Sequence, residues 1–346
     1  MNIDERKIKI LQAIIHDYIN TGEPIGSRTI AKKYDLGISS ATIRNEMSDL
    51  EEMGYLEQLH SSSGRKPSDK GYRLYVDEFM QLPTISPEDE FTIQKSIMDL
   101  AIFQMDKTIQ EVTELLSQLT KLTCIIKAPS LRQSYIKHIQ LTPIDNSNLL
   151  LTIVTDTALV KNAIVRLDIE IDDEWILKLN NYINQKLRYK TVEEFFHKII
   201  YEIEDELQNS YEILEVIIST LADALREIDD AQFYLGGATN IFNYQEYNDI
   251  DSARRFLNLL DDKEKIRLLL NEGLSPNEVS IKIGTENFIE GAENCSVISA
   301  IYSINNRPLG AVGIIGPTRM HYPKVISILS EVIKTLNKNS SDNLHK

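Results

Sequence analysis

A helix-turn-helix is predicted by the stretch Ser27-Arg-Thr-Ile-Ala-Lys-Lys-Tyr-Asp-Leu-Gly-Ile-Ser-Ser-Ala-Thr-Ile-Arg-Asn-Glu-Met-Ser-Asp-Leu-Glu-Glu-Met53. In its second half, Ile43, Met47 and Leu50 are spaced by four and three residues, which places them on one face of a helix. Gly37 permits a turn with positive φ before this helix, and Ser39 or Ser40 suits its N-cap. In a helix-turn-helix, the second helix enters the major groove of DNA.

The opposite face of the second predicted helix suits base recognition. Arginine can form a forked pair with guanine, and asparagine can do the same with adenine, while small residues allow close approach to the groove. The alternative is an ordinary solvated helix face that happens to contain one arginine. The residues that lie off the apolar stripe are Ala41, Thr42, Arg44, Asn45 and Ser48.

A basic loop follows, which we interpret as the wing of a winged helix. Residues 55–59 alternate weakly like a strand, and residues 72–76 either pair with them or begin a helix. The loop between them, Ser61-Ser-Ser-Gly-Arg-Lys-Pro-Ser-Asp-Lys-Gly71, offers hydroxyls, glycine N–H groups and cations suited to phosphate oxygens. A surface loop that is basic by chance is the alternative. The remaining candidate DNA-binding residues are Ser27, Arg28, Ser39, Ser40, Ser62, Ser63, Gly64, Arg65, Lys66, Lys70 and Arg73.

The distribution of charge argues against indiscriminate binding to nucleic acid. The 346 residues include 37 Lys/Arg and 52 Asp/Glu, a net charge of −15. Residues 1–74 contain 11 basic and 11 acidic residues, so the whole excess of negative charge lies in the remainder of the chain. An acidic body behind a neutral N-terminal part would repel DNA everywhere except at that part.

Several classes of site are not indicated by the sequence. The two cysteines, Cys124 and Cys295, lie in separate apolar runs and predict buried, reduced thiols. The six histidines show no metal-ligand spacing, so we expect neither a metal nor a cofactor. A charged N-terminus and the lack of a long apolar segment predict a soluble, cytoplasmic protein without a membrane partner.

The pattern of elements predicts an α+β protein of several domains. A first helix over residues 4–20, which Asp4 can cap, and the elements above form a predicted domain of residues 1–82. Ser86 and Pro87 then begin a helix expected to run to about Lys121, whose apolar seam either pairs two subunits or packs on a sheet, the latter being favoured. Predicted antiparallel strands place residues 86–170 and 277–338 in one sheet domain, interrupted by a mainly helical insertion over residues 171–276. A last helix is expected over residues 323–337.

Further motifs give a resemblance to a known family. They are Gly316-Pro-Thr-Arg-Met-His-Tyr322, Ile283-Gly-Thr-Glu-Asn287 and Cys295-Ser-Val-Ile-Ser-Ala-Ile-Tyr302, with the helix of residues 41–56 and the wing of residues 63–73. Together they resemble the heat-inducible transcription repressor HrcA family over essentially the whole chain. The resemblance implies a winged-helix domain, a GAF-like domain and an inserted dimerising domain. It also implies a homodimer that binds the inverted-repeat CIRCE operator of chaperone operons, is released on heat shock and depends on the GroE chaperonin.

Two other functions are alternatives to repression. One is a regulator gated by a small molecule bound in the GAF-like domain, where Arg319 beside Gly316 and Pro317 either holds an anion or forms a structural salt bridge, the latter being favoured. The other is an enzyme, against which the lack of a nucleophile–base pairing argues. What senses heat does not follow from the sequence, and our hypothesis is that the dimer loosens or aggregates at raised temperature.

Overall fold

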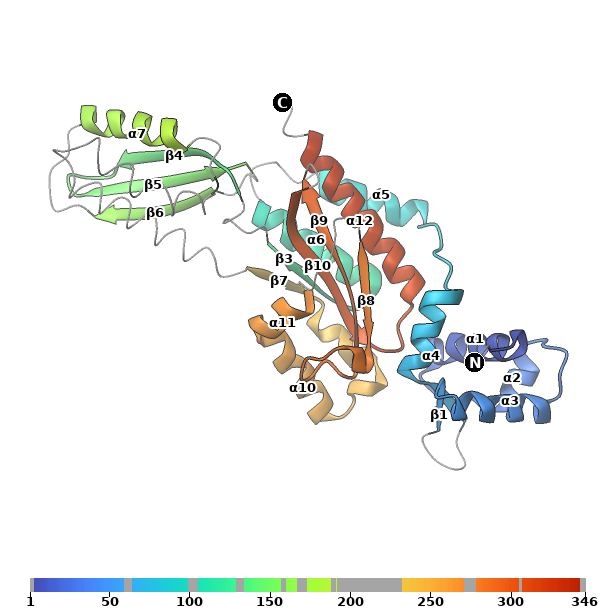
Figure 1. Cartoon of the computed structure of the whole chain (residues 1–346). Coiled ribbons are helices and arrows are strands. Elements are labelled where there is room, and N and C mark those ends of the chain that lie inside the picture. Colours follow the sequence, from blue (N-terminus) through green and yellow to red (C-terminus); the bar gives the residue numbers. More distant parts are fainter. Residues whose placement is uncertain are drawn as a thin grey trace.

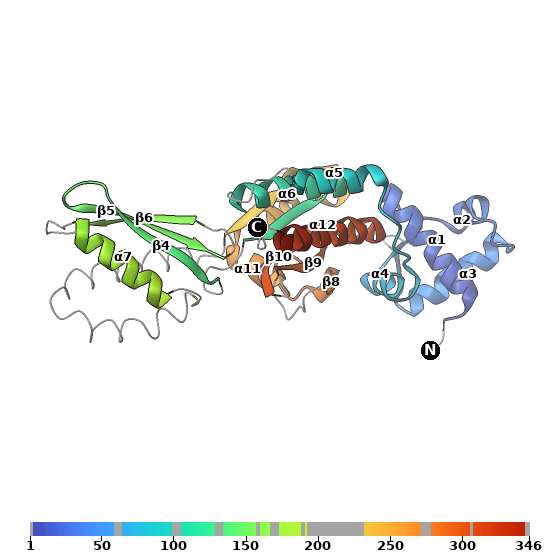
Figure 2. The ribbon, with the colours of Figure 1, turned by 90° about the horizontal axis from the view of Figure 1, so that it is seen from above.

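The chain forms three parts that lie in a row (Figures 1 and 2). The computed structural model describes residues 3–58, 64–98, 105–128, 134–156, 160–166, 173–187, 191, 232–270, 278–304 and 307–342. We call residues 3–79 the head and the five-stranded sheet with its helices the body. A separate three-stranded sheet lies on the far side of the body from the head.

The head is a winged helix. Its elements are α1 (Glu5–Thr21), α2 (Ser27–Lys33), α3 (Ser40–Glu52), β1 (Leu56–Gln58), β2 (Arg65–Pro67), α4 (Asp69–Leu74) and the π-helical turn η1 (Tyr75–Phe79). The predicted caps are confirmed, because Asp4 accepts from the backbone N–H of Lys7 at 2.8 Å and Ser39 accepts from that of Thr42 at 3.1 Å. Of the two alternatives for residues 72–76, the structure shows the helical one, since they lie in α4 and η1 and Ser68 caps α4. The strand that pairs with β1 is β2, inside the predicted loop.

The body is an antiparallel sheet with helices on both faces. Its strands are β3 (Thr123–Lys127), β7 (Phe233–Gly236), β8 (Val279–Ile283), β9 (Cys295–Ile304) and β10 (Arg307–Pro317), in the order β7-β3-β10-β9-β8. One group of helices comprises α5 (Pro87–Met98), α6 (Met105–Thr120) and α12 (Tyr322–Asp342), and the other comprises α10 (Ile250–Asp261) and α11 (Lys263–Leu270). The 3-10 turns are η3 (Ala238–Asn243), η4 (Gln245–Tyr247) and η5 (Gly284–Glu286).

Alternating side chains of the body strands enter two different apolar cores. Cys124 and Ile298 pack with buried residues of α6 and α12, whereas Ile125 and Val297 pack with residues of α10 and α11. The predicted helix from Pro87 to about Lys121 is wrong as a single element, because α5 and α6 are separate helices that contact each other. Their packing with α12 and the strands agrees with the favoured reading, in which this seam covers a sheet.

The three-stranded sheet corrects the predicted insertion boundaries. It consists of β4 (Ile136–Pro143), β5 (Asn148–Thr155) and β6 (Val160–Arg166), with α7 (Asp173–Leu187) packed on β4. The insertion therefore includes strands that we had assigned to the body, and it ends before β7, which pairs with β3. Strand alternation does not reveal which sheet a strand joins, which is why the boundary was misplaced. The helical prediction for residues 192–231 lies outside the described residues.

Side chains of α7 satisfy the backbone of β4. Asn180 accepts from the N–H of Leu141 at 2.8 Å and donates to the same residue's carbonyl oxygen at 2.9 Å. Asn184 does the same for Ile139, at 2.9 and 2.6 Å. These amides take the place of a neighbouring strand at an edge that would otherwise expose backbone groups.

Candidate nucleic-acid interface

Helix α3 presents a polar face to solvent because its other face is firmly buried. Ile43 and Leu50 are fully buried, and Met47 is 4% exposed, as the spacing predicted. On the opposite side Ala41, Arg44, Asn45 and Ser48 are exposed. Within the described part of the chain, the Arg44 guanidinium has no ion-pair partner. An unpaired arginine beside an asparagine on an exposed helix face matches the requirement for direct base contact.

The start of α3 is closed by hydroxyl groups. The Ser39 hydroxyl lies 2.9 Å from that of Thr42, and Ser40 and Thr42 are half-buried. These residues were predicted to bind DNA. The structure gives Ser39 and Thr42 a capping role at the N-terminal end of α3.

Two buried carboxylates, which the sequence reasoning missed, fix the helices relative to one another. Glu46 of α3 accepts from the ammonium of Lys7 at 2.6 Å, and hydrogen bonding to Glu46 raises the pKa of Lys7. Asp17 of α1 is 3% exposed and accepts from Lys33 at 2.5 Å and from the Tyr34 hydroxyl at 2.8 Å. An acidic residue on an otherwise apolar helix face was the available signal for Asp17.

The cations of α2 are more accessible than those of the wing. Ser27 is the first residue of α2 and is half-buried, whereas Arg28 and Lys32 are exposed. Neither Arg28 nor Lys32 has an ion pair with any residue that the structure describes. In this part of the chain, no carboxylate therefore neutralises the charge of either side chain. Lys32 was not among the predicted site residues, although its place in the last turn of α2 gave a signal.

The basic residues of the wing already have partners within the head. Arg65 pairs with Glu51 at 2.7 Å, and Lys66 pairs with Glu57 at 3.2 Å across the β1–β2 ladder. Lys70 donates to the Met53 carbonyl at 2.8 Å and lies 4.4 Å from the centre of the Tyr55 ring. Gly64 runs beside Ile25, where a Cβ atom would lie 2.4 Å from its backbone. The predicted residues Ser62 and Ser63 lie outside the described residues.

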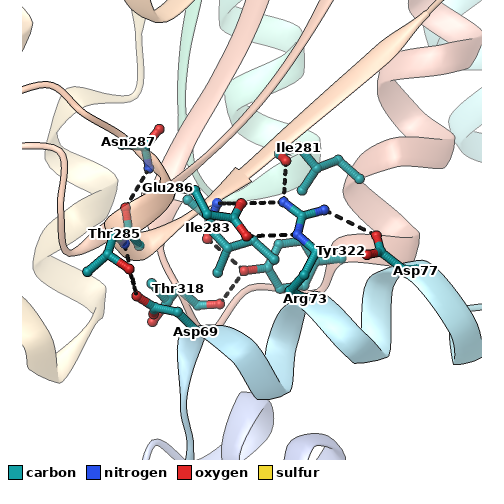
Figure 3. Close-up of polar contacts among 12 residues, drawn as sticks. Asp69, Arg73, Asp77, Ile281, Ile283, Thr285, Glu286, Asn287, Thr318 and Tyr322 are labelled. Atoms are coloured by element: carbon teal, nitrogen blue, oxygen red, sulfur yellow. Dashed lines mark hydrogen bonds and ion pairs between the residues drawn. The ribbon is translucent and has the colours of Figure 1, made fainter. Parts of the chain in front are cut away.

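Arg73 points toward Glu286 and Ile281 of the body (Figure 3). Its guanidinium binds both carboxylate oxygens of Glu286, with the Nε–Oε1 distance at 2.8 Å, and donates to the Ile281 carbonyl at 2.5 Å. It also pairs with Asp77 at 3.2 Å. Arg73 was predicted to bind DNA as part of the wing. Because residues 69–74 form a helix that packs on the body, we remove it from the proposed DNA-binding surface.

The comparisons with known proteins agree with this architecture. Residues 106–326 match the family model described as the HrcA protein C-terminal domain. A heat-inducible transcription repressor HrcA of Clostridium tetani is 52% identical over 342 residues, which cover 98% of this chain and 96% of that protein. This chain belongs to the HrcA family of heat-inducible transcription repressors. The HrcA protein of Clostridium acetobutylicum is 49% identical over 339 residues, covering 98% of each chain.

A solved structure shares the fold of this repressor over its whole length. It is the crystal structure of a hypothetical protein, which superposes with a TM-score of 0.65 at 22% sequence identity. The superposition covers 99% of each chain. At this level of identity it shows that the arrangement of head, body and insertion occurs in a second protein.

The body of the repressor is closely packed between α11 and the sheet. Leu270 of α11 packs so tightly on the sheet that a Cβ atom at Gly313 would lie 2.1 Å from its Cδ2. Arg319 pairs with Glu246 at 2.5 Å and is 8% exposed, which confirms the structural salt bridge that we favoured over an anion site. Neither feature supports a ligand-gated regulator.

The described residues contain neither a metal-binding cluster nor a membrane-spanning helix. Over those ranges, no three histidine, cysteine or acidic side chains gather closely enough to bind a metal ion. No helix in the same ranges is long and apolar enough to cross a membrane. Cys124 and Cys295 are buried free thiols, and burial raises the pKa of Cys124 to about 12 and that of Cys295 to about 11.

Proposed function

We propose that this repressor binds the inverted-repeat CIRCE operator of chaperone operons as a homodimer, with one α3 in the major groove of each half-site. The observation that carries the proposal is Arg44, which is exposed beside Asn45, has no ion-pair partner among the described residues and lies on a helix whose opposite face is buried. Guanine and adenine edges are the groups that these two side chains recognise in the major groove. The inverted repeat follows from the two-fold symmetry of a homodimer.

Phosphate contacts would come chiefly from α2 in this proposal. Arg28 and Lys32 have no ion-pair partner in the part of the chain that the structure describes, whereas Arg65 and Lys66 pair with Glu51 and Glu57. The wing would contribute its backbone N–H groups, together with Ser62, Ser63 and Gly64. Phosphate contacts fix the register of the protein on the duplex, and base contacts then provide sequence specificity. As a binding protein acting on operons, the repressor would work in the cytoplasm without catalysis.

Heat release and the GroE chaperonin complete the proposal. We infer that heating weakens the dimer or the contact between head and body, since the loss of a few kcal/mol changes such populations strongly. GroE would return the repressor to the binding-competent fold. Purified chain that is heated, cooled and supplied with GroE and ATP should regain more operator binding than the same chain without GroE. Equal recovery in both samples would contradict this part of the proposal.

A titration of the whole chain against two labelled duplexes tests the main proposal. One duplex contains the inverted repeat, and the other contains the same bases in scrambled order. Operator binding should be tighter by at least about a thousandfold, with two chains bound per duplex. Both affinities should fall as salt is raised. Equal affinities for the two duplexes, or one chain per operator, would contradict the proposal.

A further inference from the structure

The contact between head and body contains a set of paired polar groups, which we call the latch. It consists of Asp69 and Arg73 on α4, Thr285 and Glu286 in η5, and Arg319 after β10 (Figure 3 shows the first four). Its three body residues come from the two motifs at residues 283–287 and 316–322. Nothing in DNA reading requires these motifs, since they lie on the body.

The pair of Arg73 and Glu286 is the strongest element of the latch. The two side chains meet in a forked arrangement, and the Glu286 carboxylate also accepts from the Ile283 N–H at 2.8 Å. Burial alone would raise the pKa of Glu286, but the bonds from Arg73 and from the Ile283 N–H bring it below its ordinary value. Because the fork needs both partners in one plane, it defines an orientation as well as a distance.

Asp69 makes the second contact, one helical turn earlier. Its Oδ2 accepts from the Thr285 N–H at 2.9 Å and from the Thr285 hydroxyl at 3.1 Å. Gly284 has a φ of 53°, and a Cβ atom there would lie 2.1 Å from Asp69 Oδ2. The body backbone is therefore shaped to receive this one carboxylate, and no larger residue fits at position 284.

Arg319 makes the third contact, on a different helix of the head. Its Nη1 donates to the Ile19 carbonyl oxygen at 3.3 Å, and its guanidinium fills the space beside Gly22. Tyr72 of α4 also packs its ring on that of Tyr322, with the ring centres 5.9 Å apart. Contacts on two helices of the head resist rotation as well as separation.

The apolar core continues across the same junction. Buried side chains of the head, such as Ile10 and Val76, belong to one cluster with body residues such as Ile283 and Val325. Domains joined only by a flexible linker move relative to each other by default. A shared core with directional polar contacts at its rim favours one relative orientation instead.

We propose that Asp69, Arg73 and Arg319 are positioning residues that hold the reading head in one orientation on the body and thereby set the half-site spacing that the dimer accepts. This inference rests on the proposed function. A dimer with fixed heads matches one separation along the duplex, and a wrong phase forbids simultaneous engagement. A dimer with loosened heads reaches several separations, at a lower effective concentration for each.

A series of operators tests the inference on the full-length chain. Their half-sites are unchanged, and the spacer is lengthened or shortened by up to five base pairs. The native chain should prefer one spacer by about tenfold or more. In Asp69→Ala and in Glu286→Ala, the affinities for operators with different spacers should differ by no more than about threefold. The affinity for a single half-site should change little. Asp69→Asn, which keeps an acceptor for Thr285, should retain most of the preference.

Glu264→Ala is the matched control. It removes a carboxylate that pairs with Arg267 at 2.8 Å on the surface of α11, away from the head, and should leave the spacer preference unchanged. An unchanged spacer preference in both latch variants would overturn the inference. A native chain that binds no inverted repeat would instead overturn the proposed function.

A distance measurement tests the latch without DNA. Spin labels at Lys32→Cys in α2 and Asn258→Cys in α10 occupy exposed positions on head and body, and the buried native cysteines should stay unlabelled. The distribution of label distances should be narrow in the parent chain and in Glu264→Ala, and at least about twice as broad in Asp69→Ala and Glu286→Ala. Equal widths in all four proteins would overturn the inference whatever the DNA measurements give.

Discussion

The guanidinium of Arg319 closes the end of helix α1, where it donates to the carbonyl oxygen of Ile19 at 3.3 Å. Carbonyl groups in the last turn of a helix have no partner within the helix, and a cation placed there also complements the helix dipole. The same guanidinium lies 5.2 Å from the Tyr244 ring and pairs with Glu246. One side chain of the body thus stabilises the end of the first helix of the head.

A substitution at Gly22 should therefore cost more than one at Gly37. Both glycines have positive φ, 72° and 66°. A Cβ atom at Gly22 would lie 2.9 Å from Arg319 Cζ, whereas at Gly37 it would meet nothing within 4 Å. Gly37→Ala should lower the free energy of unfolding by about 1–2 kcal/mol, the strain of a left-handed backbone alone. Gly22→Ala should lower it by about 1 kcal/mol more, because Arg319 must leave its partners. Urea unfolding gives both values, and equal losses would contradict the contact.

Removal of the Tyr72 hydroxyl should not destabilise the fold. Tyr72 is 1% exposed, and its hydroxyl is buried without a hydrogen-bond partner among the described residues. Tyr72→Phe should leave the free energy of unfolding unchanged or raise it by about 1 kcal/mol. Tyr322→Phe is the matched comparison, since that hydroxyl donates to the Thr318 carbonyl at 2.6 Å and lies 2.6 Å from the Ser296 hydroxyl. It should lower stability by about 1–2 kcal/mol. A larger loss for Tyr72→Phe than for Tyr322→Phe would show that the Tyr72 hydroxyl has a partner.

Stability toward acid should depend on Asp17. Burial would raise its pKa, but hydrogen bonds from Lys33 and Tyr34 hold it below the ordinary 3.8. A carboxylate whose pKa is lower in the folded than in the unfolded chain stabilises the fold above the unfolded pKa. That contribution is lost as pH falls through the folded pKa. Asp17→Asn should therefore flatten the fall in melting temperature between about pH 5 and pH 2.

Asp251→Asn is the control for this pH dependence, because Asp251 is exposed and pairs only loosely with Arg254 at 3.8 Å. Its melting curve should follow that of the parent chain at every pH. If Asp17→Asn did so too, the Asp17 carboxylate would contribute no net stability.

Salt dependence should separate the cations of α2 from those of the wing. Arg28→Ala should lower the slope of log K against log salt by about 1, the effect of one lost phosphate contact. Lys66→Ala should lower the slope by less, because Lys66 is paired with Glu57 at 3.2 Å before DNA arrives. Titrations of operator and scrambled duplex from about 50 to 200 mM salt measure both slopes. A larger change for Lys66→Ala would show that its pair with Glu57 opens on binding.

Local patterns in the sequence predicted most of the head. Its caps at Asp4 and Ser39 and the buried stripe of Ile43, Met47 and Leu50 depend on neighbours a few residues away. The antiparallel strands of the body were also predicted within a few residues, because alternation and turn residues mark them. The structure confirms these elements.

The errors concern relations between distant segments. The pattern of residues 136–166 shows three strands, but only pairing shows that they form their own sheet and not an extension of β3. Likewise, Arg73 lies in a basic stretch, and its assignment to the body depends on Glu286, more than two hundred residues later. Sequence reasoning also counted Arg65 and Lys66 as free cations, because the cross-strand and helix partners that neutralise them appear only in the fold.

The measurement that tests the account most directly is the effect of Arg44→Ala on the ratio of operator to scrambled-duplex affinity. If α3 reads bases, loss of this guanidinium should lower the ratio by about 1–3 kcal/mol, while affinity for scrambled DNA changes little. Lys32→Ala, in the last turn of α2, should weaken binding to both duplexes equally and leave the ratio unchanged. Equal losses on both duplexes for Arg44→Ala would contradict base reading by α3.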